Sequence, residues 1–300
     1  MSSTTPTVDT RDIMLASPRR MPFAAWKNVA TCTWRESTQN NIGLVAAGVA
    51  FYTFLALVPL LGSTVLLYGL VATPRTVLGT MQSLTNIMSA DVARLIGEQL
   101  LDIVNSSSGK KGLGILFALG IALFGARNAA GSIITALNIV YEVEENRSFL
   151  RVTALALVIT AAAVVFALVG IGVVTALRFL ENLIPNAPDV VRLLIKLVSF
   201  LLVLASASAA AATLYRYAPS QTTATWVWLS PGTALSTLGW LLLSVAFGFY
   251  VSRIANYNAT YGSLGATIAL LTWVYLASYI FLLGAELNCE VERQAAKVAT

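Results

Sequence analysis

The 300-residue sequence contains no histidine and little charge of either sign. Without histidine, Ser-His-Asp catalysis, Cys-His catalysis and histidine-ligated metal sites are excluded. Lysine and arginine number 19 and aspartate and glutamate 14, so charged residues make up 11% of the chain; soluble domains carry about 25%. Two cysteines are too few for a disulfide scaffold. The composition therefore excludes both a water-soluble globule and a small disulfide-rich protein.

Apolar residues, at 57% of the chain, gather in long runs without any charge. Uncharged stretches occupy residues 37–74, 152–177, 217–252 and 254–285. A helix that crosses the hydrocarbon core needs about 20 mostly apolar residues, and these runs lack the alternation of a transmembrane β-barrel. The sequence therefore predicts an all-α fold, a polytopic membrane helix bundle with six transmembrane helices. The predicted spans are residues 43–72, 112–136, 152–180, 192–215, 231–252 and 264–288.

The polar segments give the expected domain organisation. An N-terminal segment, residues 1–41, and a short tail, residues 292–300, flank a single membrane domain over residues 42–291. Residues 76–105 carry charge and apolar stripes of helical spacing, which predicts an outer amphipathic hairpin. The charged segment 142–151 is typical of a solvated loop. Lysine and arginine are more frequent on the side of the N-terminus, which favours a cytoplasmic location for both termini.

Only a few charged residues fall at the ends of the predicted spans. Arg127 follows 15 uncharged residues, Arg216 ends the fourth span, and Glu286 lies near the end of the sixth. A charge in hydrocarbon costs about 2.5 kcal/mol or more, so each needs a partner or a path to water. All three lie toward the cytoplasmic ends of their spans. With Asn288 they form either a polar transport path or an ordinary set of ion-paired helix ends.

Other residues bear on how the helices pack. Pro59 lies inside the first span, where it removes a backbone donor and predicts a kink or a break. Small residues four apart, such as Ala46 with Ala50 and Ser206 with Ala210, allow helices to approach closely. Oligomers are therefore possible through these small-residue helix faces.

Five short motifs lie in a fixed order along the chain. They are Ala-Ala-Gly-Val-Ala-Phe-Tyr at 46–52, Ala-Leu-Asn-Ile-Val-Tyr at 136–141, Tyr-Arg-Tyr-Ala-Pro at 215–219, Asn-Tyr-Asn-Ala-Thr-Tyr-Gly at 256–262 and Leu-Gly-Ala-Glu-Leu-Asn at 283–288. Besides Glu286 and Asn288, the motif positions are Phe51, Tyr52, Pro59, Asn138, Pro219, Asn256, Tyr257, Asn258, Tyr261 and Gly262. In order and spacing the chain resembles the YihY/BrkB family of bacterial inner-membrane proteins over roughly residues 25–292.

The resemblance implies a six-span inner-membrane fold with cytoplasmic termini. One branch of that family is linked to lipid A precursors, one is named for serum resistance, and the group has carried a ribonuclease label. We expect a transporter or flippase for a lipid or another amphiphile, with membrane lipids as partners. Pro59 in the first span, the polar Asn/Tyr loop and the charges at the span ends would form its path. A non-catalytic envelope scaffold is the alternative, and an ion-coupled carrier that uses Glu286 and a ribonuclease are further ones. No catalytic residue, cofactor or metal is expected, and no nucleic-acid partner, because a basic stripe interleaved with aromatics is absent from the sequence.

Overall fold

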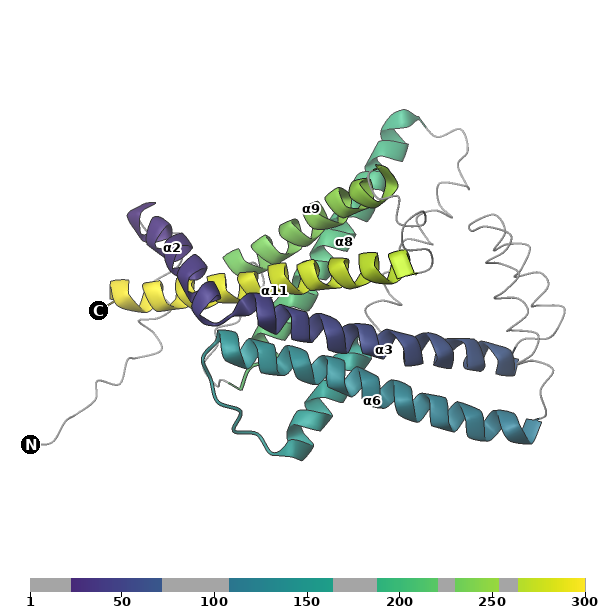
Figure 1. Cartoon of the computed structure of the whole chain (residues 1–300). Helices are drawn as coiled ribbons and strands as arrows, with labels where there is room; N and C mark the ends of the chain where they lie inside the picture. Colours follow the sequence, from purple (N-terminus) through teal and green to yellow (C-terminus); the bar gives the residue numbers. More distant parts are fainter. Residues whose placement is uncertain (1–22, 72–107, 164–187, 221–229, 254–263, 300) are drawn as a thin grey trace, which may run out of the picture. The chain divides into compact units, whose positions relative to one another are not determined.

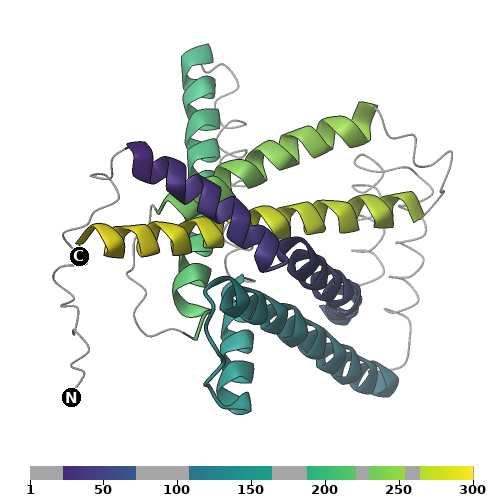
Figure 2. The same ribbon diagram turned by 60° about the vertical axis from the view of Figure 1, so that its left-hand side comes forward.

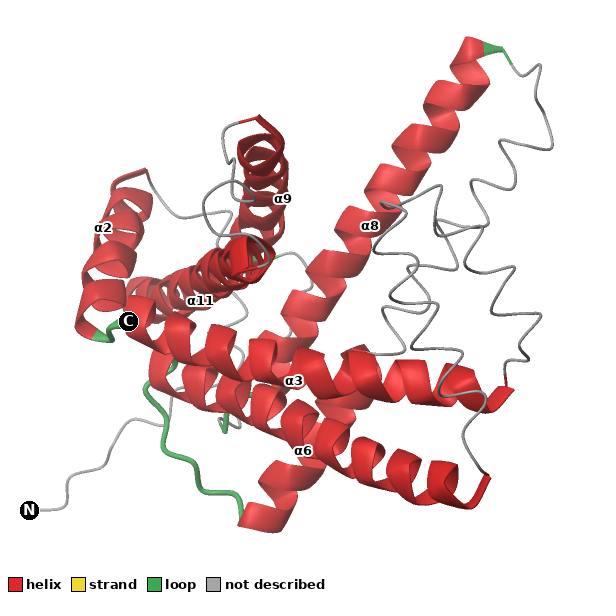
Figure 3. Ribbon diagram, turned by 45° about the vertical axis from the view of Figure 1, so that its right-hand side comes forward, coloured by secondary structure: helices red, strands yellow, loops and turns green. Residues whose placement is uncertain are grey.

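All of the described elements are helices. The computed structural model describes residues 23–71, 108–163, 188–220, 230–253 and 264–299. These residues contain helices and connecting loops and no strand (Figures 1 and 3), which confirms the expected all-α class. The helices are α2 (Phe23–Gln39), α3 (Ile42–Val71), α6 (Ser108–Val140), Phe149–Ala163, α8 (Asp189–Tyr217), α9 (Pro231–Arg253) and α11 (Leu264–Ala299).

Several of these helices are suited to a membrane. Leu193–Tyr217, Pro231–Tyr250 and Thr267–Ala295 are long and apolar enough to cross a bilayer, and Ile42–Ala56 and Phe149–Ala163 are shorter apolar helices. A helical membrane protein is thereby supported, while the number of six spans stays a prediction. The third predicted span is described only as far as residue 163.

Some expected features fall outside the described residues. These are the outer hairpin at 76–105 and the motif positions Asn256, Tyr257, Asn258, Tyr261 and Gly262. Pro59 is described, and α3 runs through it from Ile42 to Val71 without interruption. Of the two expected effects of this proline, a kink or a break, the break does not occur.

The N-terminal segment contains a helix that the hydropathy pattern did not indicate. α2 buries Ala25, Val29, Thr33 and Ser37, which are spaced four residues apart on one face. This stripe packs against α11, which α2 crosses (Figures 1 and 2). Correspondingly, α11 continues to Ala299 instead of ending near residue 288. Two of the four buried side chains carry hydroxyls, so the stripe is not apolar enough to stand out in the sequence.

α9 and α11 form an antiparallel hairpin that depends on two glycines. At their closest approach, a Cβ on Gly232 would overlap the carbonyl oxygen of Gly284, and a Cβ on Gly284 would overlap the Ser236 hydroxyl. Farther along the pair, the rings of Trp240 and Trp273 meet edge to face with centroids 6.5 Å apart. Backbone contact at one end and aromatic packing along the length fix the register of the two helices.

α8 joins this hairpin through buried hydroxyl groups. The Tyr215 hydroxyl donates to the backbone carbonyl of Phe281 at 2.6 Å and also hydrogen-bonds to the Ser236 hydroxyl. Its ring stacks on that of Phe281 at 4.8 Å. About two turns farther from the end of α8, the Ser208 and Thr237 hydroxyls lie 2.9 Å apart. These contacts satisfy polar groups that would be costly in an apolar interior.

The chain divides into two compact units. Residues 52–130 form the smaller one, in which α3 and α6 approach so closely that a Cβ on Gly125 would lie 3.2 Å from the Ala56 Cα. Residues 1–51 and 131–300 form the larger unit. The candidate site lies in the larger unit.

Candidate functional site

The last turns of α11 bury an unusual set of polar side chains. Glu286 is 0% exposed, Glu290 4% and Asn288 7%. Glu286 lies 19 residues after Thr267, about 28 Å along the helix at ~1.5 Å per residue, close to the ~30 Å thickness of a bilayer core. Buried polar groups therefore begin where the hydrocarbon region would end. We call Glu286, Asn288, Glu290 and Arg293 the α11 polar cluster.

Glu286 has one weak hydrogen-bond partner. Its Oε2 accepts a hydrogen bond of 3.5 Å from the Asn40 side-chain amide, and within the described residues its Oε1 has no partner. Asn40 lies in the turn between α2 and α3, where Asn41 takes a left-handed backbone with φ of 51°. Asparagine tolerates this conformation better than most residues. The turn thus brings Asn40 against α11.

Asn288 holds three elements together. Its side-chain oxygen accepts a 2.8 Å hydrogen bond from the Gly232 backbone N–H at the start of α9. Its side chain also hydrogen-bonds to the hydroxyl of Tyr141, directly after α6. Burial raises the pKa of Tyr141 well above its usual range, so its hydroxyl stays neutral. Asn288 is therefore a packing residue as well as a member of the cluster.

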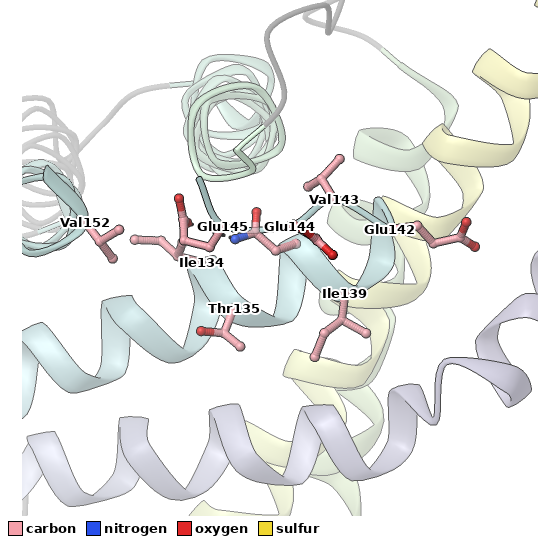
Figure 4. Close-up of a pocket in the computed structure, with 9 residues that line it drawn as sticks. Ile134, Thr135, Ile139, Glu142, Val143, Glu144, Glu145 and Val152 are labelled. Atoms are coloured by element: carbon pink, nitrogen blue, oxygen red, sulfur yellow. Dashed lines mark hydrogen bonds between the residues drawn. The ribbon is translucent and has the colours of Figure 1, made fainter. Parts of the chain in front are cut away.

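Arg293 connects the cluster to the end of α6. Its guanidinium pairs with Glu142 and with Glu290, each at 2.8 Å. Glu142 has φ of 51° and occupies the left-handed position of a Schellman motif, closed by backbone bonds of 3.0 and 3.1 Å. Glycine is the usual residue there. The glutamate side chain at this position points toward α11 (Figure 4) and provides the ion pair.

The segment expected to be a solvated loop is largely exposed and also ties α6 to α8. The Asn138 amide donates to the Glu145 carboxylate at 2.9 Å, and its oxygen accepts from the Ser220 backbone N–H at 2.8 Å. Arg147 pairs with Glu145 at 2.7 Å and donates to the Ala218 carbonyl at 2.8 Å. The arginine thus satisfies a carbonyl just beyond the C-terminus of α8, where a cation is favoured. The motif position Asn138 belongs to this network, which binds the residues on either side of Pro219.

The Glu145–Arg147 ion pair should make the stability of the folded protein depend on pH in the acid range. The Arg147 hydrogen bond lowers the pKa of Glu145 from 4.5 to about 2. Because the folded-state pKa is the lower one, the stabilisation is complete above pH 4.5 and is lost as the pH falls toward 2. In thermal melts over this window, we expect the wild type to lose about 2 °C more than Glu145→Gln, since partly exposed pairs contribute about 0–1 kcal/mol. Glu144→Gln, in the same loop, should behave as wild type. An equal loss in Glu145→Gln and wild type would contradict the role of the pair.

A pocket of about 380 Å³ opens between the end of α6, the following loop and the helix Phe149–Ala163 (Figure 4). Ile134 extends toward Val152 across it, and carboxylates of the loop lie along its rim. The pocket therefore combines apolar walls with a polar edge. Its lining residues are Ile134, Thr135, Asn138, Ile139, Glu142, Val143, Glu144, Glu145 and Val152.

The residues predicted to form one polar path are only partly brought together. Glu286 and Asn288 lie in the cluster, and Arg216, at the end of α8, interacts electrostatically with Glu292 of α11. Arg127 belongs to the smaller unit, where its guanidinium donates to the Asn128 side chain at 3.1 Å.

Sequence reasoning missed the partners of the cluster. Asn40 is 246 residues from Glu286, and nothing in its local sequence marks it as a partner. The bridge from Arg293 to Glu142 was likewise hidden, although Arg293 and Glu290 are three residues apart on one helix. Phe51 and Tyr52, also motif positions, are exposed.

Comparison with known proteins gives consistent matches. The family model described as Virulence factor BrkB matches residues 33–300. The chain is 32% identical to the ribonuclease-like protein YfkH of Bacillus subtilis strain 168 over 257 residues, which is 83% of this chain and 90% of that protein. It is 28% identical to a UPF0761 membrane protein of Verminephrobacter eiseniae, across 96% of this chain and 67% of the relative. With a UPF0761 membrane protein of Haemophilus influenzae, the identity is 23%, across 87% of this chain and 94% of the relative. No solved structure matches.

Proposed function

The chain belongs to the BrkB virulence-factor family of membrane proteins, and from that premise we propose that it moves a lipid or another amphiphilic envelope component across the bacterial inner membrane, with both termini in the cytoplasm. The observation that carries the proposal is the α11 polar cluster, with Glu286 fully enclosed near the end of a membrane-length helix. Ionisable residues in such segments are costly to bury and mark substrate or ion pathways.

The helices that lead away from the cluster expose apolar faces that suit an amphiphile. α8 exposes Leu193, Leu197 and Leu201, and α9 exposes Leu242 and Phe249. These helices belong to the same compact unit as the α11 polar cluster. Acyl chains would follow the apolar faces while the polar headgroup meets the polar helix ends. The pocket at the end of α6 repeats the combination of apolar walls and polar rim.

The two alternatives make different demands on the molecule. An envelope scaffold without transport activity needs helix faces for partners but no enclosed carboxylate. A ribonuclease without histidine would use two metal ions held by clustered carboxylates. Among the described residues, no three or more Asp, Glu or Cys side chains come together in such an arrangement. We therefore favour transport over both.

Lipid exchange in reconstituted vesicles tests the proposal. Purified protein should let a fluorescent lipid pass between leaflets, so that a membrane-impermeant reductant added outside bleaches more than the outer-leaflet share. Vesicles that contain a scaffold would bleach only that share. Arg216→Ala removes a charge next to α11, and the loss of a charged contact of about 1.5 kcal/mol would slow exchange about tenfold. Arg151→Ala, at an exposed position, should leave the rate unchanged.

A further inference from the structure

The carboxyl group of Glu286 is enclosed and nearly without partners. Its side chain has no exposed surface, and Oε1 meets no hydrogen-bond partner in the part of the chain that the structure describes. The single hydrogen bond to Oε2, from the Asn40 amide, is long at 3.5 Å. A buried carboxylate that accepts two or three good hydrogen bonds can remain charged. The environment of Glu286 does not supply them.

The charged neighbours also leave Glu286 without a cation of its own. The groups that act on it are Asn40, Glu36 of α2, and Glu290 and Arg293 of its own helix. Arg293 is already shared between Glu290 and Glu142 at 2.8 Å each. Glu36 and Glu290 add negative charge nearby. A third negative charge, on Glu286, is therefore opposed from both α2 and α11.

Elementary electrostatics then favours the protonated form. An ionised carboxylate without a cation loses far more hydration energy on burial than a neutral carboxylic acid does. Transfer of one proton from a hydronium ion in the water to Oε1 breaks one O–H bond of the hydronium, forms the O–H bond of a carboxylic acid and leaves a water molecule. Within the described residues, too few Asp, Glu or Cys side chains gather for a metal site, so a proton fits this position better than a divalent cation.

The α2–α3 turn separates Glu286 from water. Asn40 of this turn is half-buried and hydrogen-bonds to Glu286, and the next residue, Asn41, is exposed. Movement of this turn would open Glu286 to water at the end of the helix bundle where the polar cluster lies. Because Asn40 provides the one hydrogen bond to the carboxyl group, opening the turn and changing the protonation state are physically linked.

We propose that Glu286 is a proton-binding site that takes up and releases one proton in each transport cycle, so that movement of the amphiphile is driven by a proton gradient. This inference rests on the proposed function. It adds the energy source that drives the proposed transport. The ligand of Glu286 is a proton, while the headgroup of the amphiphile meets the polar helix ends of the same unit.

Two readouts on full-length protein test it. Infrared difference spectra upon a pH step should show the C=O stretch of a protonated glutamic acid, shifted by ¹³C-labelled glutamate, in the wild type. The band should be lost in Glu286→Gln and kept in Glu290→Gln. In proteoliposomes, an imposed pH gradient should accelerate exchange of a fluorescent phospholipid by wild type. Glu286→Gln should lose this acceleration completely.

The outcomes separate the two proposals. If wild type exchanges lipid but neither readout depends on Glu286, the proton site is wrong and the transport function stands. If the infrared band is lost in Glu286→Gln but wild type exchanges no lipid, the proton site stands and the transport function is wrong. Acceleration by a sodium gradient, in place of the pH gradient, would overturn the choice of a proton.

Discussion

Replacement of Gly284 by leucine should eliminate the folded protein. A Cβ at this position would overlap the Ser236 hydroxyl and lie 2.6 Å from the Gly232 carbonyl oxygen. Both neighbours belong to α9, and the backbone of a helix cannot move away without separating the pair. Overpacking a well-packed core by one or two methylenes costs about 1–3 kcal/mol, and leucine adds a larger group against backbone. The cost is then comparable to a stability of about 5–15 kcal/mol.

Alanine substitutions at two glycines of α9 provide a matched comparison for Gly284→Leu. Gly232→Ala should lower the melting temperature in detergent clearly, because its Cβ would meet the Gly284 carbonyl and the Asn288 side chain. Gly248→Ala lies on the same helix, has nothing within 4 Å of the added Cβ, and should melt as wild type or slightly higher. The measurement is a thermal melt followed by size-exclusion chromatography. A monodisperse Gly284→Leu protein with wild-type stability would show that the α9–α11 crossing is wrong.

Arg293→Ala should be the most destabilising removal of a charge. It leaves Glu290, whose side chain is 6% exposed, without a cation, while Glu142, at 49% exposed, can be hydrated. Removing one partner of a buried pair costs about 3–5 kcal/mol. Because the Arg293 side chain is itself 35% exposed, we expect about 3 kcal/mol, the lower end of that range.

A double-variant cycle tests whether the unpaired Glu290 carboxylate causes the loss of stability in Arg293→Ala. Glu142→Gln removes only the exposed partner and should cost about 0–1 kcal/mol. Arg293→Ala combined with Glu290→Gln removes the orphaned charge and should recover much of the lost stability. Denaturant titration of the detergent-solubilised variants measures each value. The buried-charge explanation fails if Arg293→Ala costs no more than Glu142→Gln, or if the second substitution makes the loss larger.

Helix positions could be predicted closely from the sequence because turn-forming asparagine, proline and glycine interrupt the uncharged apolar runs. α9 and α11 begin at Pro231 and Leu264, the residues predicted, and α3 begins at Ile42, one residue earlier than predicted. Prediction was weaker where a helix continues beyond the apolar run. The last turns of α11 carry Glu, Asn and Arg, so hydropathy suggested an end near residue 288, although the helix reaches Ala299.

The candidate site could be predicted only in part, since its contacts join distant segments. Glu286 was recognisable as an acid near the end of an apolar helix, but its full burial depends on α2. Two of the four residues in the α2 stripe that packs on α11, Thr33 and Ser37, carry hydroxyls, which lowers the hydropathy of the stripe. Likewise, Glu142 carries no sequence signal of its left-handed backbone, because that conformation arises from the Schellman motif closing α6. The burial of Glu286 depends on tertiary packing and the backbone of Glu142 on how α6 ends, and single-residue patterns encode neither.

The central claim is that the folded chain itself moves an amphiphile between leaflets. The most direct test counts protein copies per vesicle while measuring how many vesicles exchange a fluorescent lipid with their outer leaflet. We expect the fraction of fully bleached vesicles to follow the fraction that contains at least one copy of the protein. If vesicles with protein bleach only to the level of protein-free vesicles at every protein-to-lipid ratio, the chain does not transport these lipids and the claim is contradicted.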